Sequence, residues 1–197
     1  MHDIDTATVM DALDAALRRS GLDQTEFARA LGTSGSRYST YRNGSVAPTA
    51  AFLMRAIRIA DQMSAAHAEH LPTAPDAARS VRTALRENRP EWALALILGV
   101  RDRILADATT RHRALDTWGI PASTGDTRWD RLLAATIRHA LSEVGQTPPA
   151  WTDVRALDIV WLPVESLRFD EAQVRARTPD WLAAWNIFVS DLDLATL

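Results

Sequence analysis

The chain has 197 residues, of which 22 are basic and 25 acidic, giving a formal net charge of −3, and it contains no cysteine. The absence of cysteine excludes disulfide bonds and zinc sites with thiolate ligands. No run approaches the ~20 uninterrupted apolar residues of a membrane-spanning helix and no signal peptide is evident, so we expect a soluble, cytoplasmic protein without membrane contact.

The composition of the chain changes near residue 72. Both tyrosines lie before this point and all seven tryptophans lie after it. The stretch LPTAPD at 71–76 contains two prolines and is typical of a linker. Since domains commonly have ~100 to 150 residues, we expect two domains in this chain, over residues 1–70 and 77–197.

The first predicted helix begins at Asp5 or Thr6, either of which can cap it, and ends at Gly21. Its apolar residues recur every four positions and predict a buried stripe of Val9, Leu13 and Leu17. A second helix should begin near Gln24, because Asp23 and Glu26 have the spacing of a reciprocal N-terminal cap. Its buried face is predicted to contain Phe27, Ala28 and Leu31.

Gly32 stands where the second helix should end, because glycine adopts a positive φ without a Cβ penalty. Thr33 or Ser34 can then cap a third helix that runs to about Asn43 and stops at Gly44. Two short helices joined by so tight a turn are typical of a helix-turn-helix. In that motif the second helix enters the major groove of DNA.

A fourth helix should open at Pro48-Thr49, since proline is favoured in the first turn of a helix. Its inward residues are predicted to be Phe52, Ala56, Ile57 and Met63. The window between Glu26 and Asp61 contains no acidic residue, whereas it contains Arg29, Arg37, Arg42, Arg55 and Arg58. This local excess of positive charge favours a nucleic-acid partner despite the negative net charge.

The N-terminal domain resembles the phage-repressor-like (XRE) family of DNA-binding domains from about residue 5 to residue 63. In that family the first helix of the motif begins with Gln, as at Gln24, and carries Ala and Gly at the positions of Ala28 and Gly32. The helix-ending Asn43-Gly44 falls in the same register.

Some positions depart from the family pattern. Tyr38 and Tyr41 stand where smaller or purely apolar core residues are usual, which leaves open whether they face the core or the groove. Ser45 replaces a frequent basic residue. Arg42 stands where an acidic residue is common and Leu17 where its arginine partner would be, so the buried ion pair of the family is not expected.

The resemblance implies a set of DNA contacts. Gln24, Ser34 and Asn43 would contact phosphates, which position the protein without reading sequence. Base edges would be reached from Gly35, Ser36, Arg37, Ser39 and Thr40. Of these, Arg37 can make a bidentate contact to guanine, worth ~1 to 3 kcal/mol of discrimination, whereas Arg42 would strengthen binding to any sequence. One such domain makes few contacts, so we expect a homodimer on double-stranded DNA with half-sites ~10 base pairs apart.

The C-terminal half is also predicted to be mainly helical. Its first three helical segments are expected over residues 77–88, 90–106 and 109–118, followed by a loop over residues 119–126. In the second of these helices the predicted buried residues are Trp92, Ala95, Leu96, Ile104 and Leu105. Asp126 or Thr127 can cap the clearest helix of this half, which ends at Gly145. Its apolar face should be central to the domain and contains Trp129, Leu132, Leu133, Thr136, Ile137, Ala140, Leu141 and Val144.

The last fifty residues have weaker signals. The run ALDIVWL at 156–162 has no clear period, so helix and strand cannot be separated there. Short helices are expected over 169–177 and 179–185, and NIFV at 186–189 suits a short strand or an extended segment. The fold class is therefore mainly α, with at most a short strand near the end.

No catalytic site is expected in the C-terminal half. His139 and Glu143 share a helical face, yet no metal-binding motif, helical ribonuclease motif or glycine-rich phosphate loop accompanies them. His67 and His70 form an H-x-x-H pair without a third ligand, so we expect no metal or other cofactor. The remaining option of a DNA-targeted enzyme is therefore the least favoured.

The tryptophans of this half are expected mostly in its core, with Trp181 and Trp185 as candidates for a partner-binding surface. The motifs around Arg128-Trp129-Asp130 and Pro149-Ala150-Trp151 resemble the C-terminal half of some actinobacterial XRE-type regulators. The leading hypothesis is a homodimeric, sequence-specific transcriptional repressor. The resemblance implies an alternative, an antitoxin-like regulator whose C-terminal half binds and neutralises a cognate toxin.

Overall fold

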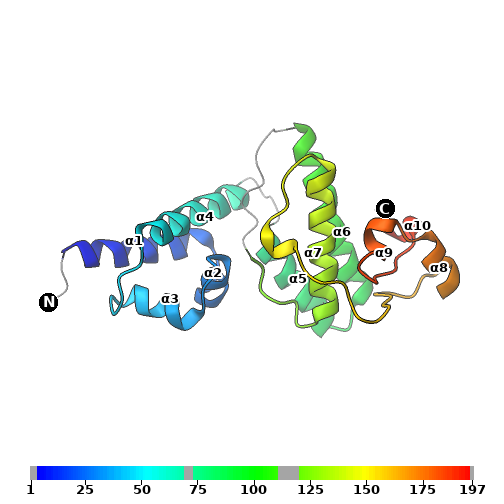
Figure 1. The fold of residues 1–197 in the computed structure, drawn as a ribbon, viewed down its shortest axis with the longest axis horizontal. Helices are drawn as coiled ribbons and strands as arrows, with labels where there is room; N and C mark the ends of the chain where they lie inside the picture. The colour runs from blue at the N-terminus through cyan, green and yellow to red at the C-terminus, as the bar shows by residue number, and fades with distance from the viewer. Residues whose placement is uncertain (1–3, 69–72, 111–119, 196–197) are drawn as a thin grey trace. The chain divides into compact units, whose positions relative to one another are not determined.

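The computed structural model describes residues 4–68, 73–110 and 120–195 and confirms a mainly α fold (Figure 1). The chain forms two compact units. The first unit runs to Pro75 and includes the segment that ends at Ala122, and the second contains the rest. No helix in the described ranges has both the length and the apolarity needed to cross a bilayer.

The first unit is built from α1 (Ile4–Ser20), α2 (Gln24–Ala30), α3 (Gly35–Arg42) and α4 (Ala50–Ala68). Figure 1 shows α1 and α4 side by side, with α2 and α3 together on one side of this pair. Because α1 contacts the other three helices, the core forms around it. Its fully buried side chains include Leu13, Phe27, Leu31, Tyr38 and Met63.

The predicted buried stripes of α1 and α4 are confirmed, apart from Ile57. Val9, Leu17 and Phe52 are partly buried against the core cluster, and Ala56 is fully buried within it. Ile57 is only half-buried and lies on the outer face of α4. The prediction failed there because Ile59 and Ala60, two and three residues further on, take the inward positions.

The start and end of α2 follow the predicted signals. The Asp23 carboxylate accepts a hydrogen bond from the Glu26 backbone N–H at 2.8 Å, and the Glu26 carboxylate accepts one from the Asp23 N–H at 3.4 Å. This reciprocal cap satisfies two donors that the helix itself leaves without partners. Beyond the helix, Gly32 has a φ of +73°, which reverses the chain into the turn.

α3 is capped by Ser34 and not by Thr33. The Ser34 hydroxyl accepts from the backbone N–H of Arg37 at 3.2 Å, and Gly44 ends the helical segment with a φ of +72°. At the start of α4 the Thr49 hydroxyl accepts from the Phe52 N–H at 3.2 Å. Two short helices joined by a tight turn, as expected from the sequence, are therefore present in α2 and α3.

Both tyrosines of α3 face the core. Tyr38 is fully buried, packs edge-on against Phe27 with ring centroids 5.6 Å apart, and donates its hydroxyl to the Leu13 carbonyl at 3.0 Å. Burial raises the pKa of Tyr38 to about 12. Tyr41 is 8% exposed and packs against Phe52 at 4.9 Å. Because these large rings fill the inner side of α3, the opposite side of the helix is left to Arg37 and short polar residues.

The helices of the second unit are α5 (Ala74–Arg86), α6 (Pro90–Thr110), α7 (Thr127–Glu143), a 3-10 turn η1 (Ala150–Thr152), α8 (Glu171–Arg177), α9 (Asp180–Ala183) and α10 (Asp191–Leu194). α7 contacts α6, η1 and α9, so it is the central element, as its pattern predicts. Asp126 caps it by accepting from the Arg128 N–H at 2.8 Å. Nearly all its predicted apolar residues are buried, whereas Val144 is half-buried.

Two predictions at the start of this unit were wrong. The linker over 71–76 is too long, because α5 already begins at Ala74; residues 71 and 72 lie outside the described ranges. Proline at position 75 is compatible with this start, since the first turn of a helix has no internal acceptor for its N–H. In α6 the predicted core residues Trp92 and Ala95 are exposed, and the buried face is instead formed by Ala93, Leu94, Ile97, Leu98 and Val100.

The C-terminal segment contains a single parallel bridge, between Trp161 and Ile187, and no longer strand among the described residues. The Trp161 N–H donates to the Asn186 carbonyl at 2.9 Å, and the Phe188 N–H donates to the Trp161 carbonyl at 2.9 Å. Asn186 has a φ of +58°, which turns the chain and prevents further pairing. The apolar run at 156–162 is therefore neither helix nor extended strand.

Candidate nucleic-acid interface

The outer side of α3 is the candidate interface. Ser36 and Arg37 are exposed there, whereas Gly35, Ser39 and Thr40 are partly exposed, so the predicted base-reading residues lie on one short helix. Because the tyrosines anchor the inner side, this arrangement is fixed by the core. A Cβ added at Gly35 would meet only the Thr25 hydroxyl, at 3.8 Å, so the fold itself does not require glycine at that position.

The hydroxyl groups of α3 are mostly engaged in local hydrogen bonds. Ser34 caps the helix and its hydroxyl lies 3.1 Å from that of Ser36, whereas the Thr40 hydroxyl donates to the Arg37 carbonyl at 2.8 Å. The Asn43 side-chain carbonyl accepts from the Ser45 N–H at 3.0 Å. The amide hydrogens of Asn43 are thus the groups that it can offer to a phosphate.

Arg37 is the long cationic side chain on this surface. Its Nε donates to the Tyr41 hydroxyl at 2.8 Å, and its guanidinium carbon lies 5.8 Å from the centre of the Tyr41 ring. A hydrogen bond at Nε leaves the Nη hydrogens of the guanidinium for an outside acceptor. The tyrosine therefore restrains an exposed side chain whose flexibility would otherwise oppose binding.

Arg42 joins three helices. Its Nε is paired with the Asp14 carboxylate on α1, and its Nη1 donates to the Gln24 side-chain oxygen on α2 at 2.5 Å. The hydrogen bond that Arg42 donates to Asp14 raises the pKa of Arg42. Two of the predicted phosphate contacts, Gln24 and Arg42, are therefore bonded to each other, and the Arg42 charge is compensated within the fold.

Sequence reasoning did not find Asp14. No ion pair was expected there, because Arg42 and Leu17 replace the acid and the arginine of the family pair, whereas Asp14 stands one turn before Leu17 on the same helix. Neighbours on a helix surface lie three or four residues apart, so a search of both adjacent turns of α1 could have identified it. An ion pair between the first and third helices is thus present, with the acid on α1 and the base on α3.

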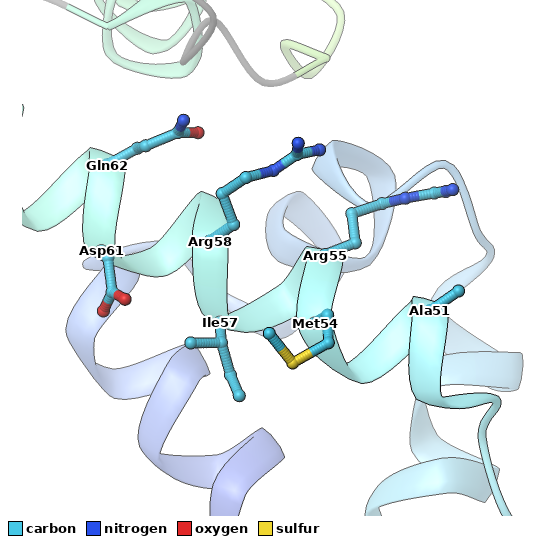
Figure 2. A pocket seen from close by; sticks show the side chains of 7 residues that line it. All are labelled: Ala51, Met54, Arg55, Ile57, Arg58, Asp61 and Gln62. Carbon is cyan, nitrogen blue, oxygen red and sulfur yellow. The ribbon is translucent and has the colours of Figure 1, made fainter.

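The basic window divides into separate surfaces. Figure 2 shows Arg55 and Arg58 extending from the same side of α4, with Met54 and Ile57 on the other side. They border a groove of about 630 Å³ whose lining residues all belong to α4, and none comes from α3. Arg55 also donates to the Leu31 carbonyl at 3.3 Å. These two arginines therefore do not add to the α3 surface.

The predicted partner-binding tryptophans are both half-buried. The Trp181 ring lies flat on the His139 ring, with centroids 4.2 Å apart and planes 5° apart, and the His139 Nε2 lies 3.6 Å from the Glu143 carboxylate. Burial lowers the pKa of His139. Trp181 is thus packed within its own unit. Among the described residues, no group of three His, Cys, Asp or Glu side chains could hold a metal ion; His70 lies outside them.

Comparison of the chain with protein-family models, with curated proteins and with solved structures finds no match.

Proposed function

We propose that the first unit binds double-stranded DNA through α3 and that the protein is a homodimeric, sequence-specific transcriptional repressor of the phage-repressor-like (XRE) type. The observation that carries this proposal is the division of α3 into two sides. Tyr38 and Tyr41 occupy the inner side, whereas Arg37 and small polar residues occupy the outer side. A helix with a flat, polar, acid-free outer surface suits close approach to a major groove.

The local charge of α3 supports this proposal. The helix carries Arg37 and Arg42 and no acidic residue, but Arg42 is paired with Asp14. One uncompensated arginine on α3 gives a small phosphate-binding contribution, because affinity depends on the number of phosphates that are neutralised. Two copies on half-sites ~10 base pairs apart would double these contacts, which is the reason to expect a homodimer.

The same sparse surface predicts limited base reading. Arg37 is the side chain on the outer side of α3 that can form two parallel hydrogen bonds with guanine. Gly35 and Ser36 beside it can contribute little discrimination. We therefore expect a short operator whose recognition also depends on DNA shape.

The test is selection of duplexes from a random pool, followed by measurement of affinity for the selected and an unrelated duplex. Arg37→Ala should reduce the ratio of these affinities by about 5- to 100-fold, which corresponds to the discrimination of one bidentate contact. Arg155→Ala is the matched control, since it removes an arginine whose side chain is 80% exposed in the second unit. Failure to select any duplex, or an unchanged ratio in Arg37→Ala, would contradict the proposal.

An antitoxin-like regulator remains the second candidate function. It is favoured by exposed apolar side chains in the second unit, of which Ile159 is 79% exposed and Leu167 fully exposed. Large apolar groups at the surface are typical of protein–protein contacts. Co-purification of the chain with the product of a neighbouring gene distinguishes this candidate from a repressor that acts alone.

A further inference from the structure

A groove of about 710 Å³ lies in the second unit, away from the residues discussed so far. It is bounded by the N-terminus of α6, the segment 162–169 and α8. Its walls contain the apolar residues Pro90, Leu162, Pro163, Val164, Phe169 and Val174. Most of these side chains are only half-buried, so the groove presents apolar surface to the outside. No predicted site residue belongs to it.

All the charged residues that line this groove are acidic: Glu91, Glu165 and Glu171. Glu171 forms an ion pair with Arg175 one turn later on α8. In the described part of the chain, Glu91 and Glu165 are exposed and have no ion pair or hydrogen bond through their carboxylates. Two carboxylates beside apolar walls therefore remain available to an external cation.

Two further side chains extend the apolar surface beyond the groove. Leu167 follows the lining residue Ser166 and is fully exposed, and Trp92 follows Glu91 and is 49% exposed. Tryptophan is a side chain that typically anchors a protein partner, and an exposed leucine adds apolar area next to it. The Arg89 guanidinium carbon lies 5.6 Å from the centre of the Trp92 ring, so Trp92 is partly covered from its own unit, whereas Leu167 is fully exposed.

We propose that this groove binds a basic segment of a partner protein, in which arginine or lysine residues alternate with large apolar residues. The apolar side chains of the segment would contact Leu162, Val164 and Leu167, whereas its cations would lie beside Glu91 and Glu165. The Phe169 ring is engaged by the Arg177 guanidinium, 4.6 Å from its centre. The acidic lining of the groove favours a positively charged partner, because like charges at a contact are unfavourable. DNA is excluded as the occupant for the same reason, so the proposal is independent of DNA binding by α3.

The probe for this proposal is a fluorescein-labelled synthetic peptide in which arginine and leucine alternate. Two companion peptides separate charge from apolar contact: one has serine in place of leucine, and the other has glutamate in place of arginine. The full-length chain should bind the arginine–leucine peptide at least about tenfold more tightly than either companion, as measured by fluorescence anisotropy. Equal binding of the serine peptide would mean attraction by charge alone and would overturn the proposal.

Matched variants locate the binding site. Glu91→Gln/Glu165→Gln should weaken binding of the arginine–leucine peptide by about tenfold. Asp153→Asn/Asp158→Asn makes the same change of net charge at side chains that are 79% and 78% exposed outside the groove, and should leave binding unchanged. Equal losses in the two double variants would overturn the proposal.

The apolar contribution has its own pair of variants. Leu167→Ser should weaken peptide binding several-fold, because Leu167 directly follows the lining residue Ser166. Ile159→Ser should not, because Ile159 is equally apolar and 79% exposed but stands three residues from the nearest lining residue, Leu162. Helical circular dichroism of all variants should match the parent chain, since every altered side chain is exposed. If the groove variants instead abolish self-association of the parent in light scattering and leave peptide binding intact, the occupant is a second copy and the proposal is wrong.

Discussion

The backbone path through α2 and α3 is set by local signals, although the Arg42 side chain also reaches α1, whereas the C-terminal segment from residue 150 onward depends on bonds between distant residues for its path. Both regions contain a helix with an Asp-initiated reciprocal cap, Asp23 with Glu26 and Asp170 with Gln173. After α2 and after α3, glycines at positive φ end each helix within the same short stretch. In the C-terminal segment, the path of the chain is fixed by bonds between distant residues, such as Arg131 Nη1 to the Ala156 carbonyl at 2.8 Å.

This difference in range has a consequence for stability. A region organised by local signals retains much of its helical preference when a distant contact is lost, because caps and glycines act within a few residues. A region organised by distant contacts retains little structure when one contact is lost, because its backbone groups then lose their hydrogen-bond partners together. This contrast can be tested by core substitutions, cap substitutions and titration, which are expected to change the free energy of unfolding by successively smaller amounts.

The largest effect is expected from core truncation. Phe27→Ala removes a fully buried ring from the first unit and should lower its free energy of unfolding by about 3–5 kcal/mol. Leu182→Ala removes a fully buried side chain of α9 and should cost about 2–5 kcal/mol in the second unit. Hydrogen exchange followed by mass spectrometry should show faster exchange only in the unit that carries the substitution.

Two results of the same hydrogen-exchange experiment would contradict this expectation. If either variant accelerates exchange equally in α1–α4 and in α6–α10, the two units unfold together and their separate stabilities are not meaningful. If Leu182→Ala leaves the amides of Trp161 and Phe188 protected, the C-terminal segment does not depend on distant packing, and the contrast between the two regions is wrong.

The caps give the next effect in size. Asp23→Ala and Asp170→Ala each remove a carboxylate that accepts from a backbone N–H, at 2.8 Å and 2.9 Å respectively. Each should cost about 0.5–2 kcal/mol, measured by urea unfolding. Asp→Asn at the same positions is the control, because asparagine also caps helices and should recover most of the loss. A loss in one region only would show that the two caps are not equivalent.

The elements predicted from the sequence are those with local signals. The bounds of α2, α3 and α7 followed from Asp23, Ser34 and Asp126 as caps and from the glycines beyond each helix. In α6 the predicted burial of Ile104 is confirmed, whereas that of Trp92 and Ala95 was wrong, because the sequence of the helix is apolar almost all round and periodicity gives little information. The bridge between Trp161 and Ile187 depends on a turn at Asn186 that no local pattern indicates.

The candidate interface shows the same division. The residues on the outer side of α3 could be named from the sequence, because the resemblance to phage-repressor-like domains implies their positions. Their hydrogen bonds could not, because the partner of Arg42 lies 28 residues away at Asp14. The groove beside Phe169 was missed as well, because it combines residues of α6 with a segment that has no periodic pattern.

A smaller effect is expected from titration of His139 in the second unit. Burial lowers its folded pKa below the ordinary value of 6.5, so the unfolded chain binds the proton more tightly. The histidine therefore contributes stability above pH 6.5, and this contribution is lost as the pH falls through and below that value. Unfolding of the second unit followed between pH 7 and pH 5 should show the decrease, and His139→Gln should flatten it.

The smallest effect is expected from Tyr41→Phe, which removes one oxygen atom and tests whether the Tyr41 hydroxyl restrains Arg37 on the α3 surface. Tyr41→Phe retains the ring that packs on Phe52 at 4.9 Å but deletes the acceptor for the Arg37 Nε. Its stability should change by about 1 kcal/mol or less, because Nε can bond to water instead. On a selected duplex, loss of this restraint should reduce discrimination a few-fold, less than in Arg37→Ala. In the double variant with Arg37→Ala, Tyr41→Phe should have no further effect, because the hydroxyl acts only through Arg37. An additive loss would mean instead that the tyrosine hydroxyl contacts DNA on its own.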